Sequence, residues 1–277
     1  MLKGCPYGSH RVKKPAGALP QTAECLDNDM SKVYDNEIVI DVQTLNVDSA
    51  SFTQIEQEAG GDERRIGEIV LDTVRRFGKQ QNPVTGSGGV LTGRVKSIGS
   101  TIAGNCDLKP GDEIVTLVSL SLTPLYIEDI LGVRPAVDQV DIRGTAVLFE
   151  RTGYAKIPPD ISRGVALAVL DVAGAAPQAH KLVKPQDTVC IIGAAGKSGM
   201  LCSYQARKDA GPDGLVVGLT SSEKNVKRLE TLGLCHRFGQ ANATNPIETM
   251  KVVEELTGGR MADVTINCAN NPGTEMA

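Results

Sequence analysis

The chain has 277 residues, 41% of them hydrophobic and 22% charged, which is a globular composition and enough length for one large or two ordinary domains. Its formal net charge is −4, and no basic run or aromatic-interleaved basic patch occurs, so we expect no nucleic-acid partner. No apolar run reaches the length of a bilayer span or follows the basic start as a signal peptide would, and we expect a cytoplasmic protein with no membrane partner.

The first half of the chain predicts strands. Segments rich in Val, Ile, Leu and Thr, bounded by Gly, Pro, Asn or Asp, cover 37–47, 89–99, 112–122 and 140–150. Between the first two, Ile66, Ile69, Val70 and Val74 recur at helical spacing and the pattern ends near Gly78, which predicts a helix. We therefore expect a β-rich, barrel-like domain over residues 1–155.

The second half alternates strands and helices. Strands are predicted near Val189, Val216, Arg237 and Val264, with helices between them. Such alternation specifies a parallel sheet covered by helices on both faces, so residues 156–277 are predicted to form a Rossmann-type, doubly wound domain.

The last predicted helix has clear start signals. Asn245 is placed to cap its N-terminus and Pro246 to occupy the first helical position. The following apolar residues are predicted to share one stripe, and they are Ile247, Met250, Val253 and Leu256.

Three glycines mark the first turn of this second half. Gly193, Gly196 and Gly199 follow a strand and open a helix, with Lys197 and Ser198 between them. This G-x-x-G-x-x-G spacing is a variant of the dinucleotide fingerprint, in which glycines give a tight turn, a close approach to the pyrophosphate and close helix packing. Packing alone could also require them, but the strand, turn, helix and second strand around them favour cofactor binding.

The second strand bears on which nucleotide binds. A carboxylate at its end would accept the ribose 2′-hydroxyl of NAD, but Thr220 and Ser221 occupy that place. Lys224, Lys227 and Arg228 could favour the 2′-phosphate of NADP, or they could be the solvated face of an amphipathic helix. We expect NAD as cofactor, with NADP left open.

The end of the last predicted strand completes the expected cofactor site. Asn267, Cys268 and Ala269 stand there, at the sheet edge where open α/β sheets bind ligands. A doubly wound dinucleotide domain typically has about six strands, whereas four are predicted, so we expect a domain incomplete at its C-terminus. We also expect a homo-oligomer.

Segments spread over the whole chain resemble one superfamily. They are "EIVIDVQTLNVDSASF", "GVLTGRVKSIGS", "LKPGDEIVTL", "YAKIPPDIS" and "LVKPQDTVCIIGAAGKSG". The chain thus resembles the medium-chain dehydrogenase/reductases, which implies a GroES-like barrel joined to a Rossmann domain with the active site between them. The zinc ligands of that superfamily fall at Asp48, Gly89 and near Ala168, none of which is Cys or His, so the resemblance implies a branch without a metal.

Further segments resemble one family more closely. They are "KGCPYGSHRV", "DSASFTQIEQEAGGD", "NPVTGSGG", "LVSLSLTPL", "LDVAGAAPQ" and "GAAGKSGMLC". The family is that of the L-erythro-3,5-diaminohexanoate dehydrogenases of bacterial lysine fermentation. The resemblance implies NAD-dependent oxidative deamination of this small diamino acid to 5-amino-3-oxohexanoate, ammonia and NADH.

Such a reaction needs a general base near neutral pH, because hydride leaves the carbon only when its amine is neutral. Asp48 is the first candidate through the superfamily alignment, and its alternative role is a cap or turn aspartate. Asp171, inside an apolar run, is the second, and Ser49 could orient Asp48 or be an ordinary turn serine. Two other functions stay open: a zinc-free enone or quinone reductase, and a dinucleotide-binding sensor without catalysis.

Overall fold

Contacts within the computed structural model, which describes residues 1–276, divide the chain between Asp171 and Val172. We call Met1–Asp171 unit 1 and the remainder unit 2, and each is described by itself. The division lies after the predicted domain boundary between residues 155 and 156. Helix α3 (Arg163–Leu170) packs on strands of unit 1 and therefore belongs to that unit. In the described part of the chain, no helix combines the length and apolar character needed to cross a bilayer.

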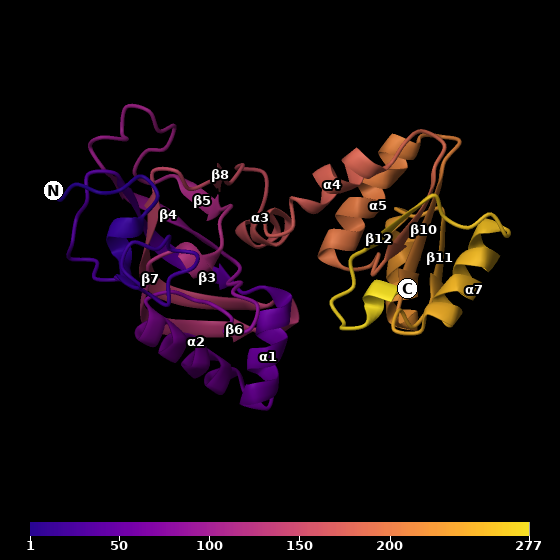
Figure 1. Ribbon diagram of the computed structural model, residues 1–277, viewed down its shortest axis with the longest axis horizontal. Coiled ribbons are helices and arrows are strands. Elements are labelled where there is room, and N and C mark those ends of the chain that lie inside the picture. The colour runs from indigo at the N-terminus through magenta and orange to yellow at the C-terminus, as the bar shows by residue number, and fades with distance from the viewer. Residues whose placement is uncertain (277) are drawn as a thin grey trace. The chain divides into compact units, whose positions relative to one another are not determined.

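An antiparallel six-stranded sheet forms the framework of unit 1, with strand order β6-β7-β3-β4-β5-β8 (Figure 1). Its strands are β3 (Glu37–Asn46), β4 (Val90–Ile98), β5 (Glu113–Thr116), β6 (Leu125–Arg134), β7 (Gln139–Phe149) and β8 (Tyr154–Lys156). A separate pair joins β1 (Val12–Lys14) and β2 (Cys25–Leu26). Short 3₁₀ turns cover Ser9–Arg11, Leu120–Leu122 and Pro135–Val137.

Three of the four predicted strands of this half are confirmed, and the fourth was predicted too long. The segment 112–122 is a strand only to Thr116, and the hydroxyl of Ser119 then accepts from the amide of Ser121 and caps a 3₁₀ turn. The long strand β6 was not predicted, because its sequence mixes charged residues with apolar ones and its residues alternate poorly in burial.

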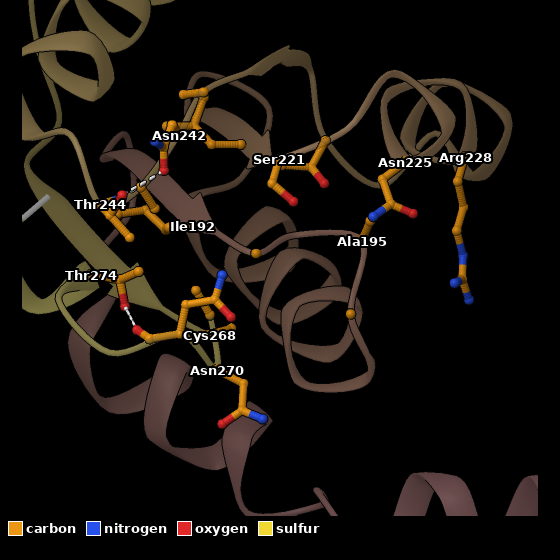
Figure 2. A pocket seen from close by; sticks show the side chains of 18 residues that line it. Ile192, Ala195, Ser221, Asn225, Arg228, Asn242, Thr244, Cys268, Asn270 and Thr274 are labelled. Atoms are coloured by element: carbon orange, nitrogen blue, oxygen red, sulfur yellow. Dashed lines mark hydrogen bonds between the residues drawn. The ribbon is translucent and has the colours of Figure 1, made fainter. Parts of the chain in front are cut away.

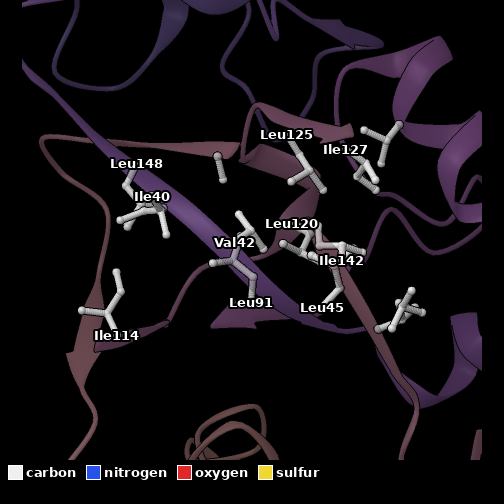
Figure 3. Close-up of a cluster of buried hydrophobic side chains, with 14 of the residues drawn as sticks. Ile40, Val42, Leu45, Leu91, Ile114, Leu120, Leu125, Ile127, Ile142 and Leu148 are labelled. Atoms are coloured by element: carbon white, nitrogen blue, oxygen red, sulfur yellow. The ribbon is translucent and has the colours of Figure 1, made fainter. Parts of the chain in front are cut away.

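Aliphatic side chains from the strands fill the core of unit 1 (Figure 3). Ile40 and Leu91 on neighbouring strands are fully buried, and burying a side chain of this size stabilises the fold by about 1.5–3 kcal/mol. Helices α1 (Ser49–Ala59) and α2 (Glu63–Phe77) pack against the same core.

Helix α2 confirms the prediction made from its spacing. Asp62 accepts hydrogen bonds from the first backbone amides, and Gly78, with φ +70°, ends the helix. Ile66, Val70 and Val74 are buried on one side, where α2 packs against β6.

A parallel four-stranded sheet forms unit 2, in the order β11-β10-β9-β12. Its elements are α4 (Ala175–Leu182), β9 (Thr188–Ile192), α5 (Lys197–Ala210), β10 (Leu215–Thr220), α6 (Glu223–Leu232), β11 (Arg237–Gln240), α7 (Pro246–Thr257), β12 (Val264–Asn267) and a 3₁₀ turn at Thr274–Met276. One apolar layer joins the sheet to α4, α5 and α6, and a second joins its other face to α7. The predicted doubly wound alternation is confirmed.

Helix α7 begins as predicted, but only the second half of its predicted stripe faces the sheet. Asn245 accepts from the amide of Glu248 and caps the helix. Ile247 and Met250 are 62% and 51% exposed, whereas Thr249 and Val253 are buried. The prediction was right for Val253 and for Leu256, which packs partly buried against the same layer, and wrong for Ile247 and Met250, because three residues turn a helix by about 300° and a strict three-residue repeat drifts around it.

Candidate dinucleotide site

The turn between β9 and α5 has little room for side chains. A Cβ added to Gly193, whose φ is +77°, would lie 2.9 Å from the carbonyl carbon of Cys268, and one added to Gly199 would lie 2.2 Å from the carbonyl oxygen of Gly193. These two glycines are therefore required by the close approach of turn, helix and the segment after β12. Gly196 is exposed and its Cβ would meet nothing closer than 3.3 Å, and no side chain caps the helix that it precedes.

A pocket of about 390 Å³ opens beside this turn, at the carboxyl ends of the parallel strands. Figure 2 shows Asn225 and Arg228 projecting from α6 on one side of it, and Asn242, Thr244 and Thr274 on the other. Arg228 is the one charged residue among the lining residues, and none of them is Asp or Glu. The pocket is therefore suited to an anionic ligand.

The structure places the predicted cofactor residues in two groups. Those that line the pocket are Gly193, Gly196, Thr220, Ser221, Cys268 and Ala269. Those outside the lining are Lys197 and Ser198, half-buried in the first turn of α5, buried Gly199, exposed Lys224 on α6, and Asn267. Asn267 does not line the pocket but hydrogen-bonds two residues that do. Its Nδ2 donates to the carbonyl oxygen of Thr274 at 2.9 Å, and its Oδ1 accepts from the amide of Ala269 at 2.9 Å.

Sequence reasoning missed the part of the pocket that follows β11 and the turn after β12. Asn242 follows β11 by two residues, and its Oδ1 accepts from the amide of Thr244 at 3.1 Å. Asn270, Asn271 and Thr274 complete the wall. The rule that ligands bind at the carboxyl ends of parallel strands could have pointed to Asn242 as well.

Two thiols meet at the wall of the pocket. The Sγ of Cys268 donates to the Sγ of Cys202 at 3.8 Å, and Cys202 is a buried residue of α5. This hydrogen bond, together with burial, raises the pKa of Cys268, while the same bond lowers the pKa of Cys202. Cys268 therefore faces the pocket as a neutral thiol.

In unit 1, Asp48 caps helix α1. Its Oδ1 accepts from the amide of Ser51 at 3.1 Å and its Oδ2 accepts from the Ser51 hydroxyl. A Cβ at Gly89 would lie 2.8 Å from the amide nitrogen of Asp48, so two of the three positions that match superfamily zinc ligands are neighbours here. Across residues 1–276, no group of three or more His, Cys, Asp and Glu side chains is arranged to hold a metal ion.

The other two predicted catalytic residues occupy separate elements of unit 1. The Oγ of Ser49 donates to Oδ2 of Asp138 at 2.6 Å, just before β7, rather than to Asp48. Asp171 is half-buried at the C-terminal end of α3, where its amide donates to the carbonyl of Leu167 at 3.1 Å.

Solved structures define the class to which these two folds belong. A CurK enoyl reductase superposes with a TM-score of 0.54 at 15% identity, covering 85% of this chain and 60% of its own. An alcohol dehydrogenase from Thermotoga maritima gives 0.53 at 18% identity, covering 88% of this chain and 67% of its own. The GroES-like fold of unit 1 and the Rossmann fold of unit 2 are those of the medium-chain dehydrogenase/reductase oxidoreductases.

Sequence relatives narrow the class to one family. Residues 10–158 match the family described as L-erythro-3,5-diaminohexanoate dehydrogenase N-terminal domain. Proteins named L-erythro-3,5-diaminohexanoate dehydrogenase from Acetoanaerobium sticklandii and Fusobacterium nucleatum are 53% and 51% identical, each covering 100% of this chain and 80% of its own length. The chain belongs to the L-erythro-3,5-diaminohexanoate dehydrogenase family.

Proposed function

We propose that this protein catalyses the NAD-dependent oxidative deamination of L-erythro-3,5-diaminohexanoate to 5-amino-3-oxohexanoate in lysine fermentation. The observation that carries the proposal is the identity of 53% and 51%, sustained over the whole chain, to two proteins of that name. In the balanced reaction, the amine, NAD⁺ and water give the ketone, ammonia, NADH and a proton. A catalytic domain over 1–155, a dinucleotide-binding domain over 156–277 and a homo-oligomer belong to the same proposal.

The pocket of unit 2 fits a nicotinamide dinucleotide. Gly196 is exposed at a helix N-terminus that no side chain caps, where backbone amides favour phosphate, and the lining carries no carboxylate. When bound, the nicotinamide supplies the acceptor for the hydride from the amine-bearing carbon. Ser221 and Arg228, which line the pocket, are the residues that we propose to discriminate between the 2′-hydroxyl of NAD and the 2′-phosphate of NADP.

The proposed chemistry needs no metal. Glycine and alanine at positions 89 and 168 offer no side-chain ligand, which leaves Asp48 alone of the three matching positions. We propose that a carboxylate, Asp48 or Asp171, accepts the proton of the substrate ammonium and later activates the water that hydrolyses the imine, with Ser49 joining the start of α1 to Asp138.

The test is the absorbance of NADH during incubation of the protein with L-erythro-3,5-diaminohexanoate and NAD⁺, with ammonia measured in parallel. We expect equal amounts of NADH and ammonia, unchanged after metal chelation. A protein that binds NAD but forms no NADH with this substrate would contradict the proposal. Oxidation of NADPH by an enone or a quinone in the same preparation would then identify a reductase.

A further inference from the structure

A second cavity, of about 210 Å³, lies within unit 1 between the strands and the first turn of α3. Its polar lining residues are Thr44 of β3, Thr92 of β4, Arg134 of β6, Gln139 and Asp141 of β7, and Arg163 of α3. Pockets for drug-sized ligands have volumes of about 300–1,000 Å³, so this cavity suits a smaller molecule. Its two guanidinium groups and one carboxylate make it strongly polar.

The carboxylate of Asp141 is oriented by two neighbours. Its Oδ1 accepts from the hydroxyl of Thr44 at 2.7 Å and from the Nη2 of Arg134 at 2.7 Å. Both hydrogen bonds fall on the same oxygen, which leaves Oδ2 available to a ligand. A carboxylate held in this way can bind an ammonium group with a charge-assisted hydrogen bond.

The guanidinium of Arg163 is held only loosely by the protein. Its Nε forms a long ion pair with Oε2 of Glu113 at 3.7 Å, beyond hydrogen-bonding distance, while the other oxygen of Glu113, Oε1, accepts from Arg94 at 2.8 Å. Among residues 1–276, the guanidinium of Arg163 makes no hydrogen bond with a protein group. Its planar set of donors matches the two oxygens of a carboxylate.

Buried polar groups lie under these charges. Thr92 and Gln139 are 1% and 2% exposed, and the Nε2 of Gln139 donates to Oδ1 of Asn46 at 3.2 Å. The Nδ2 of fully buried Asn46 has no acceptor in the described part of the chain. Buried donors are rarely left without a partner, and Asn46, which does not itself line the cavity, is hydrogen-bonded to the lining residue Gln139.

We propose that this cavity binds the two charged ends of the diamino acid: Arg163 binds its carboxylate and Asp141 binds the ammonium on C5, which keeps its charge during the reaction. This inference rests on the proposed function, because a zwitterion with a second ammonium is the ligand that matches one guanidinium without a protein hydrogen bond and one oriented carboxylate. The amine on C3 would then lie between the two anchors, so that it can lose its proton and be oxidised.

The test compares wild type, Arg163→Gln and Asp141→Asn on three compounds: 3,5-diaminohexanoate, its primary amide, which lacks the carboxylate charge, and 3-aminohexanoate, which lacks the C5 amine. Arg163→Gln should lower kcat/KM for the acid by about 10- to 150-fold, the range for a hydrogen bond to a charged group, and leave that for the amide nearly unchanged. Asp141→Asn should lower kcat/KM for 3,5-diaminohexanoate by a similar factor and leave kcat/KM for 3-aminohexanoate nearly unchanged. Arg143→Gln is the matched control, because Arg143 on β7 bonds exposed Glu128 and Asp129 instead.

Calorimetric binding of the acid and its amide, without nucleotide, separates the cavity from the reaction. If wild type turns over 3,5-diaminohexanoate but each variant lowers kcat/KM equally for all three compounds, the two residues are merely structural and the proposed cavity site is wrong. If wild type forms no NADH yet binds the acid, and Arg163→Gln abolishes that binding, the cavity site stands and the proposed function fails. Equal binding of acid and amide by wild type would overturn the cavity site whatever the turnover.

Discussion

Charged side chains inside unit 1 have different kinds of partners. Arg11 and Glu37 are 1% and 2% exposed and form a two-point ion pair, in which the Nη2 of Arg11 donates to Oε2 of Glu37 at 2.7 Å. Although burial alone would raise the pKa of Glu37, the hydrogen bonds from Arg11 and His10 lower it overall. Lys79 is equally buried, but its Nζ donates to two backbone carbonyls, those of Pro20 and Ala23.

Lys79 should therefore give the unfolding free energy a measurable pH dependence. Burial lowers its pKa to about 8 from the ordinary 10.5, so between these values the unfolded chain binds a proton that the folded chain does not. Stability relative to Lys79→Met should be flat below pH 8 and rise above it by up to about 1.4 kcal/mol per pH unit until about pH 10.5. Urea unfolding of both proteins across this range measures the difference, and parallel curves would contradict it.

The role of Asp48 can be separated from its cap. Asn is as good a helix cap as Asp, so Asp48→Asn removes the charge with little change in stability, whereas Asp48→Ala should cost about 1 kcal/mol. If Asp48 is the general base, Asp48→Asn should lower kcat by about 10²- to 10⁴-fold while NAD binding is retained. Normal turnover in Asp48→Asn would leave Asp48 only the cap seen in its contacts with Ser51.

At the scale of elements, the β9–α5 turn depends on backbone contacts rather than on side chains. Gly199 lies against the carbonyl of Gly193, and Gly193 lies against the segment that follows β12. Three elements thus meet without a side chain between them, and the pocket opens at this junction.

Adding one methyl group to this junction should disrupt it. We expect Gly199→Ala to destabilise unit 2 by about 1–3 kcal/mol, as overpacking commonly does, and to weaken dinucleotide binding. Gly174→Ala is the control in the same unit, since Gly174 has an ordinary helical φ and open space around its Cβ. Thermal unfolding and NAD titration of both variants measure the effects, and equal behaviour of the two would contradict the steric argument.

At the scale of the molecule, each candidate site is contained in one unit. All residues that line the dinucleotide pocket come from unit 2, and all that line the smaller polar cavity come from unit 1. The two ligands should therefore stabilise different parts of the chain.

Hydrogen exchange can detect this separation. NAD at about 100 times its Kd should raise the free energy of opening by about 2.7 kcal/mol for amides of β9, β10 and α5, and less for β3 and β7. 3,5-Diaminohexanoate alone should protect peptides of β7 and α3. Equal protection of both units by NAD would show that they open as one cooperative body.

Much of this protein could be predicted from local sequence. The strand, glycine turn and helix around Gly193, the cap at Asn245, and the doubly wound alternation follow from steric limits and hydrophobic periodicity that act over a few residues. Family membership was equally readable, because the segments that resemble the family lie throughout the chain. The exposed half of the α7 stripe, Ile247 and Met250, and the end of β5 were wrong, since only packing against neighbours decides which helix face is buried and where pairing stops.

The tertiary structure decided which distant residues share a site. It brought Thr274 to the dinucleotide pocket and placed Arg163 of α3 beside the same cavity as Asp141 of β7. None of these neighbourhoods has a local sequence signal, because each depends on the pairing of strands and the docking of a helix far apart in the chain. Local sequence thus determined the elements and the glycine turn, and long-range packing determined which charges and amides face each cavity.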